Sequence, residues 1–190
     1  FWLLAKYKIG FWMALASLAL FFSIRSYSFY NANHQQKIIV YNANRLAALD
    51  FISGRTYQFI GDTALTQNAS LSNFVLTPSR VFHRIKQTDH LPRFYKRGNT
   101  LFFNSKKIML IDYDVAKSHS FSKDTADLVI LSRNASLYIS DLNNRLQGKK
   151  IVIDGSVPAW KAKYWIKDCD SLKIPCHNVA TDGAFVMSLH

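Results

Sequence analysis

An apolar stretch without charges, Ile9 to Ile24, constrains the fold of this chain more than any other feature. A helix needs about 20 apolar residues to cross a bilayer, and the stretch reaches that length with its flanks. Trp12 lies near one end and Tyr27 and Tyr30 near the other, as in the aromatic belts of spanning helices. The sequence therefore predicts a membrane segment over 1–30, with a transmembrane helix at about 9–30. A buried core helix and the core of a signal peptide are the alternatives.

Basic residues are unevenly distributed around this stretch. Lys6 and Lys8 precede it, whereas Arg25 is followed by no Lys or Arg until Lys37. Because positive charge favours the cytoplasmic side, we expect the rest of the chain to lie on the outer side. The sequence starts at Phe1, among apolar residues rather than at a Met, so we expect the natural start to lie upstream.

The whole chain is strongly basic. Its 24 Lys and Arg residues face 12 acidic residues, all of them Asp, and the formal net charge is +12. Such a charge favours nucleic acid or anionic lipid as a partner, although it also serves solubility alone. Cys169 and Cys176 do not form a CxxC motif, which leaves a single disulfide open in an oxidising compartment.

Beyond a polar linker over 31–36, residues 37–190 show the patterns of a mixed domain. Gly54 and Gly61 flank an alternating segment, which we expect to pair with 37–42 as a hairpin. Ser156 and Pro158 are suited to start a helix whose apolar stripe includes Trp165. Strands are expected over 37–42, 55–60, 80–85, 100–104, 107–111, 128–131, 150–153 and 184–189, and helices over 136–146 and 158–172. This order predicts an α/β domain of the α+β sandwich type, with sheets covered by helices.

Aspartates follow several of the expected strands. Asp62, Asp112, Asp114 and Asp154 lie where α/β folds commonly place reactive groups. Short carboxylates are also good turn formers and caps, and we favour that interpretation because no histidine cluster accompanies them. The sequence has no HExxH motif and no other close pair of histidines, the usual signal of a zinc site.

Cations and aromatic residues alternate between Arg93 and Arg97. Such a segment can neutralise phosphates and stack on the bases of a single strand. The alternative is an exposed loop after Leu91-Pro92 whose aromatic side chains pack inward. The candidate DNA contacts are Arg80, Arg84, Lys86, Arg93, Phe94, Tyr95, Lys96 and Arg97.

Three segments together resemble a known family. They are 37–62 (KIIVYNANRLAALDFISGRTYQFIGD), 127–136 (DLVILSRNAS) and 151–186, which begins IVIDGSVPAW and ends DGAFV. The chain resembles the C-terminal region of ComEC-type competence proteins, which are channels that carry single-stranded DNA across the inner membrane in natural transformation. The resemblance implies that the last spanning helix leads into a metallo-β-lactamase-like αββα domain over 37–190.

The chain departs from the catalytic members of that fold. Those members carry an HxHxDH motif after the first hairpin, and no such motif lies between Asp62 and Lys107. Arg133-Asn134 stands where active relatives carry a histidine pair. The resemblance therefore implies a degenerate domain that is not an enzyme and holds no cofactor. The vestigial positions would be Asp62, Asp112, Asp114, Arg133, Asn134 and Asp154.

From these observations we expect part of a DNA-uptake channel in the bacterial inner membrane, with a periplasmic domain that guides single-stranded DNA. The other expected partners are the lipid bilayer and the remaining transmembrane helices of the parent chain, and a homo-oligomer is left open. One alternative is a membrane-anchored hydrolase that uses Asp62, Asp112 and Asp114 on a cation such as magnesium. Another is a structural cap on the membrane bundle.

Overall fold

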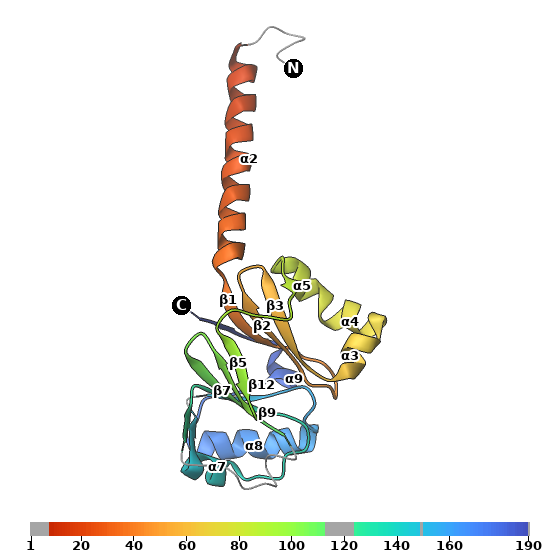
Figure 1. Cartoon of the computed structure of the whole chain (residues 1–190), viewed down its shortest axis with the longest axis vertical. Coiled ribbons are helices and arrows are strands. Elements are labelled where there is room, and N and C mark those ends of the chain that lie inside the picture. The colour runs from red at the N-terminus through yellow and green to blue at the C-terminus, as the bar shows by residue number, and fades with distance from the viewer. Residues whose placement is uncertain (1–7, 113–123, 149, 190) are drawn as a thin grey trace.

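A long helix projects from a layered domain in the computed structural model, which describes residues 8–112, 124–148 and 150–189 (Figure 1). The helix, α2 (Lys8–His34), is exposed to solvent along its length and apolar enough to cross a membrane by length and composition. It continues through Asn31–His34, where the sequence predicted a linker, and Gln35 alone separates it from the first strand. The polar residues extend the helix because the His34 ring contacts the Tyr30 carbonyl oxygen at 2.9 Å.

The first sheet contains the strands next to α2. They are β1 (Gln36–Val40), β2 (Ala48–Ser53), β3 (Thr56–Gly61), β4 (Lys86–Gln87) and β13 (Phe185–Ser188), in the order β13-β1-β2-β3-β4. The predicted hairpin between 37–42 and 55–60 is wrong, because β2 lies between β1 and β3 and pairs with both. Residues 48–52 of β2 are buried on both faces, so β2 lacks the alternation that marks a half-buried strand.

Short helices follow β3 and cover the outer face of the first sheet. They are α3 (Thr63–Gln67), α4 (Ala69–Val75) and α5 (Thr77–Phe82). The expected strand over 80–85 is wrong, because Pro78 in the first turn of α5 starts a helix there. Leu65 and Leu76 from this layer are fully buried against Ile39 and Ile52 of the sheet.

The second sheet follows in the chain and is mostly parallel. Its order is β12-β11-β9-β7-β6-β5, with β7, β9, β11 and β12 parallel to their neighbours and β5 and β6 antiparallel. The strands are β5 (Phe94–Arg97), β6 (Thr100–Phe103), β7 (Lys106–Ile111), β9 (Leu128–Leu131), β11 (Ile151–Ile153) and β12 (Cys176–Asn178). A separate pair joins β8 (Asp124–Ala126) to β10 (Leu146–Gly148).

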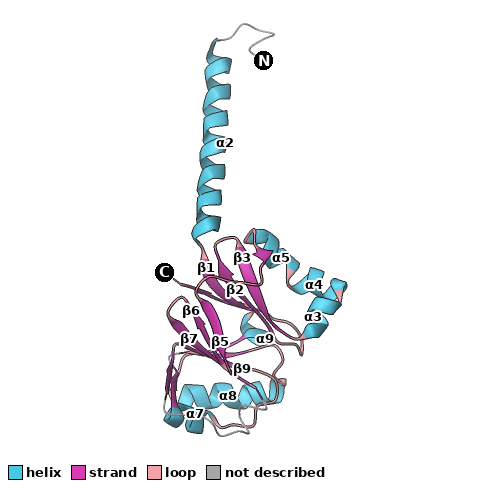
Figure 2. Cartoon of the chain, viewed as in Figure 1, coloured by secondary structure: helices cyan, strands magenta, loops and turns pink. Residues whose placement is uncertain are grey.

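Helices also cover the outer face of the second sheet (Figure 2). They are α7 (Ile139–Arg145) and α8 (Ala159–Ser171), while α9 (Val179–Asp182) leads into β13. Ala162, Trp165 and Cys169 of α8 are buried, which confirms the predicted apolar stripe. The helix begins after Pro158 rather than at a Ser156 cap, and Ser156 has other partners.

A shared apolar core joins the two sheets. Phe51 from the first sheet and Leu101, Phe103 and Ile130 from the second are fully buried in it. Burying one such side chain contributes about 1.5–3 kcal/mol. The layers therefore run helix, sheet, sheet, helix, which confirms the predicted α+β sandwich.

Candidate functional site

Polar residues from three strand ends meet at one edge of the sandwich. Asp62 follows β3, Ser132 and Arg133 follow β9, and Asp154 and Ser156 follow β11. Because β9 and β11 are parallel neighbours in register, their carboxyl ends lie side by side. We call these five residues the strand-end cluster.

An ion pair within this cluster connects the two sheets. Arg133 Nη2 lies 2.7 Å from Asp62 Oδ1, while Asp62 Oδ2 accepts a hydrogen bond of 2.7 Å from the Ala47 N–H. The Arg133 backbone adopts a φ of +56°, and its N–H donates to Ser156 Oγ at 2.6 Å. The bond to Asp62 raises the pKa of Arg133, so the guanidinium stays charged beside this carboxylate.

Asp154 is the most buried acid of the cluster, at 1% exposed. Its Oδ1 accepts hydrogen bonds from the N–H and the hydroxyl of Ser156, whereas its Oδ2 has no hydrogen-bond partner among the described residues. Burial raises the pKa of Asp154 to about 6, although hydrogen bonds from Ser132 and Ser156 oppose the shift. A group so closed to solvent has no access to a substrate, and we interpret this part of the cluster as structural.

The cluster does not resemble a zinc site. Zinc sites are built mainly from His and Cys ligands, and this cluster offers only carboxylate and hydroxyl oxygens. Over residues 8–112, 124–148 and 150–189, no group of three or more His, Cys, Asp or Glu residues could hold a metal ion. The Arg133 guanidinium instead provides the positive charge next to Asp62.

The structure brings most of the predicted vestigial positions together. Asp62, Arg133 and Asp154 belong to the cluster, and the charge of Asp112 also acts on Arg133. Asn134 points toward α8, where its Oδ1 accepts a hydrogen bond of 2.8 Å from Lys161. Asp114 lies outside the described residues.

A second candidate surface lies on the antiparallel edge of the second sheet. Tyr95, Phe102 and Lys107 are register partners on β5, β6 and β7 and share one face. The Tyr95 and Phe102 rings stack with centroids 4.5 Å apart and planes 11° apart, and Lys107 Nζ lies 5.8 Å from the Phe102 centroid. Arg97 shares this face, two residues beyond Tyr95. We call these four residues the basic-aromatic row.

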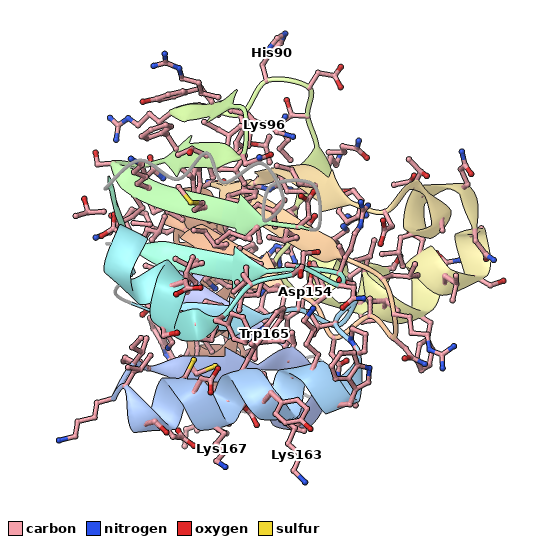
Figure 3. The ribbon with its side chains drawn as sticks, turned by 90° about the horizontal axis from the view of Figure 1, so that it is seen from below. His90, Lys96, Asp154, Lys163, Trp165 and Lys167 are labelled. Atoms are coloured by element: carbon pink, nitrogen blue, oxygen red, sulfur yellow. The ribbon has the colours of Figure 1, made fainter. Side chains whose placement is uncertain are left out.

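The segment 93–97 is split between solvent and core. Arg93, Tyr95, Lys96 and Arg97 are exposed, with Tyr95 at 58%. Phe94 instead packs inward, with its ring centroid 5.0 Å from that of Phe51. One of the two aromatic residues therefore follows the alternative interpretation of an inward-packed side chain. Figure 3 shows Lys96 projecting on the side opposite Lys163 and Lys167 of α8.

Arg80 lies inside the domain and not on this surface. Its Nε and Nη2 lie 2.9 and 3.1 Å from the two oxygens of Asp50, and its guanidinium stacks 4.2 Å from the Tyr57 ring centroid. Asp50 is fully buried and also accepts a hydrogen bond of 2.8 Å from the Tyr41 hydroxyl. Since its fork is occupied, we remove Arg80 from the DNA contacts.

Arg84 and Lys86 lie beside the first sheet. Lys86 is exposed on the edge strand β4, and Arg84 adopts a φ of +54° in the turn before it. Neither residue belongs to the basic-aromatic row on the second sheet. The predicted contacts thus form more than one group in space.

Several site residues were not identified from the sequence. Phe102 and Lys107 join the basic-aromatic row only through strand pairing. Ser132 joins the strand-end cluster through Ser156, at 3.2 Å between the hydroxyl oxygens. A signal did exist for Asp50, because an acid inside the apolar strand ALDFIS requires a cationic partner.

Comparisons with known proteins identify the family. No curated protein and no solved structure matches the chain significantly. The family model described as the ComEC C-terminal domain matches residues 38–189, which span both sheets and their covering helices. The chain therefore belongs to the ComEC C-terminal domain family.

Proposed function

We propose that this chain is the C-terminal part of an inner-membrane channel for single-stranded DNA, and that its domain contacts the DNA without catalysing a reaction. Membership of the ComEC family connects the chain with competence, DNA uptake and the membrane. The finer role rests on the charges and rings of the second sheet. The observation that carries it is the basic-aromatic row.

The row combines two properties that single-stranded DNA requires. The Tyr95 ring is exposed and held flat against Phe102, so a base can stack on it without first ordering the side chain. The exposed cations Arg93, Lys96 and Arg97 flank it and can neutralise phosphates. Because every base has a π-face, such contact is tolerant of sequence, which suits a channel that accepts any strand.

The strand-end cluster supports a role without catalysis. Arg133 pairs with Asp62, and Asp154 is closed to solvent, so neither carboxylate is poised to bind a catalytic metal ion. The layer order of helix, sheet, sheet and helix, with acids at strand ends, is compatible with a degenerate metallo-β-lactamase-like domain. We place this domain on the periplasmic side, following the charge asymmetry around α2.

The test measures DNA binding by the full chain in nanodiscs of zwitterionic lipid, with a fluorescent oligothymidine. Tyr95→Ala should weaken binding about 5- to 150-fold, because base stacking on an aromatic ring contributes about 1–3 kcal/mol. Lys96→Ser with Arg97→Ser should lower the slope of log K against log salt by about 1.4, which is about 0.7 per phosphate. Lys163→Ser with Lys167→Ser is the matched control, since it removes equal charge from α8.

The outcomes separate the proposal from its rivals. Equal binding by all variants, or binding that does not depend on salt, would overturn the DNA contact. Cleavage of the oligonucleotide that requires magnesium and is lost in Asp112→Ala would show a nuclease instead. A structural cap predicts no binding by any variant.

A further inference from the structure

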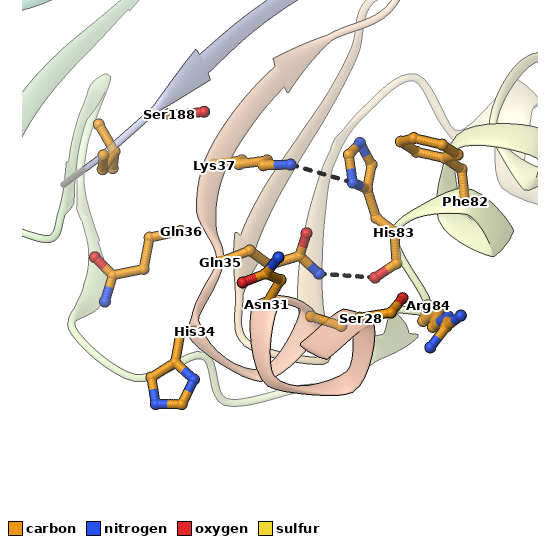
Figure 4. Close-up of a pocket in the computed structure, with 12 residues that line it drawn as sticks. Ser28, Asn31, His34, Gln35, Gln36, Lys37, Phe82, His83, Arg84 and Ser188 are labelled. Atoms are coloured by element: carbon orange, nitrogen blue, oxygen red, sulfur yellow. Dashed lines mark hydrogen bonds between the residues drawn. The ribbon is translucent and has the colours of Figure 1, made fainter. Parts of the chain in front are cut away.

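We propose that a cavity at the junction of α2 and the domain binds the phosphate group of a membrane phospholipid. The cavity has a volume of about 420 Å³ and lies between the last turns of α2, the start of β1 and the end of α5. Its lining includes Asn31, His34, Lys37, Phe82, His83 and Arg84 (Figure 4). The proposal is independent of DNA binding and rests on α2 spanning the bilayer.

The junction is held firmly, so the cavity keeps a fixed place at the end of the helix. Gln35 Nε2 donates hydrogen bonds to the carbonyl oxygens of Gly54 at 3.0 Å and His83 at 2.7 Å. The Gly54 N–H in turn donates to the Gln35 carbonyl oxygen at 2.8 Å. Gly54 has a φ of +59°, and a Cβ there would lie only 2.9 Å from the Asn33 carbonyl oxygen. The Arg55 guanidinium adds a contact 4.9 Å from the Phe29 ring centroid.

The cavity lies at headgroup depth when α2 crosses the membrane. A hydrocarbon core of about 30 Å takes up about 20 helical residues, which run from Ile9 to about Ser28. The headgroup layer adds about 5–8 Å on each side, or roughly four to five more residues. Asn31 and His34, which line the cavity, fall within this layer.

The lining is suited to an anion. Lys37 and Arg84 supply positive charge, and none of the described lining residues is acidic. Lys37 Nζ lies 3.4 Å from His83 Nδ1 and is the donor, because a charged ammonium cannot accept. Burial, together with the charge of Lys37, lowers the pKa of His83, so the ring stays neutral and its Nε2–H remains a donor. Lys37 has further N–H groups for a phosphate oxygen.

Apolar side chains beside the cavity favour a lipid over free phosphate. Phe82, at 81% exposed, lines the cavity, and Val81 next to it is 70% exposed. Large apolar side chains in contact with water are costly, but at a membrane surface they can contact the acyl boundary. Figure 1 shows α5 on the side of the domain from which α2 emerges, so these side chains lie toward the bilayer.

The test is native mass spectrometry of the full chain in non-ionic detergent. The probes are phosphatidylglycerol, diacylglycerol without a phosphate, and inorganic phosphate. We expect one phosphatidylglycerol retained per chain, and no retained diacylglycerol. Lys37→Gln with Arg84→Asn should weaken retention about 10-fold, because charge-assisted hydrogen bonds to the phosphate are lost. Asn tolerates the positive φ of residue 84, so the fold should persist, which the unfolding midpoint checks.

Two comparisons decide between the sources of phosphate. Lys163→Ser with Lys167→Ser, at the far end of the domain, should retain the lipid as the original chain does. Phe82→Ser should weaken retention of phosphatidylglycerol but leave inorganic phosphate unaffected. Equal retention of diacylglycerol, equal loss in the control variant, or binding of inorganic phosphate alone would overturn the proposal.

Discussion

The buried carboxyl of Asp154 should make the stability of the domain depend on pH. Burial raises the pKa of Asp154 from 3.8 to about 6, and its Oδ2 has no hydrogen-bond partner among the described residues. Between about pH 4 and pH 6 the folded chain therefore binds more protons than the unfolded chain. The contribution of Asp154 to the free energy of unfolding is greatest below pH 4, is lost as the pH rises through 6, and is flat above that. Two pKa units correspond to about 3 kcal/mol.

Urea unfolding of the full chain in detergent, at half-unit pH steps from 4 to 7, measures this contribution. Other groups also titrate, so the quantity to follow is the difference between the original chain and Asp154→Asn. Asn keeps an acceptor oxygen for the Ser156 N–H but cannot ionise. The difference should change by about 3 kcal/mol across the range, to the disadvantage of the original chain at high pH. Asp141→Asn, on the exposed start of α7, is the control, and parallel curves for the chain and Asp154→Asn would refute the reasoning.

Three further predictions follow from buried contacts. Arg80→Met should lower the free energy of unfolding by about 3–5 kcal/mol, since it leaves Asp50 charged and buried, and adding Asp50→Leu should restore much of it; calorimetry that shows no loss would contradict the pairing. Gly155→Ala should cost about 1–3 kcal/mol in the same assay, because its Cβ would overlap a backbone carbonyl. The Cys169 and Cys176 thiols are hydrogen-bonded, which together with burial raises the pKa of Cys169. In a periplasmic domain they should be oxidised to a disulfide, and mass spectrometry after thiol alkylation that finds both free would contradict the proposed orientation.

The elements best predicted from the sequence are those whose pattern is local. The apolar run of α2 and the Trp165 stripe of α8 follow from the spacing of apolar residues within one element. The fully buried strand β9 (LVIL) is similarly evident, because a short β-branched run between polar residues has few alternatives. β2 was missed because Asp50 interrupts its pattern, and that charge is satisfied only by Arg80, thirty residues later in the chain.

The candidate sites were predicted in their chemistry but not in their geometry. Strand-end positions for Asp62 and Asp154 could be inferred because carboxyl ends of parallel strands share an edge. The pairing of Asp62 with Arg133 could not, since it depends on how the two sheets are packed. Likewise, the composition of 93–97 identified Tyr95, while its stacking partner Phe102 is set by the register of β5 with β6.

The most direct test of the central claim locates the DNA on the domain. A single strand that carries bromodeoxyuridine is irradiated with the full chain in zwitterionic nanodiscs, and the crosslinked peptides are identified by mass spectrometry. We expect the crosslinks at Tyr95 and Phe102, which form the stacked pair of the basic-aromatic row. Trp160 and Tyr164 of α8 are also exposed and lie among lysines, so they provide an internal comparison. Crosslinks confined to α8, or none at all, would contradict the proposal that the β5–β6 edge of the second sheet contacts the strand.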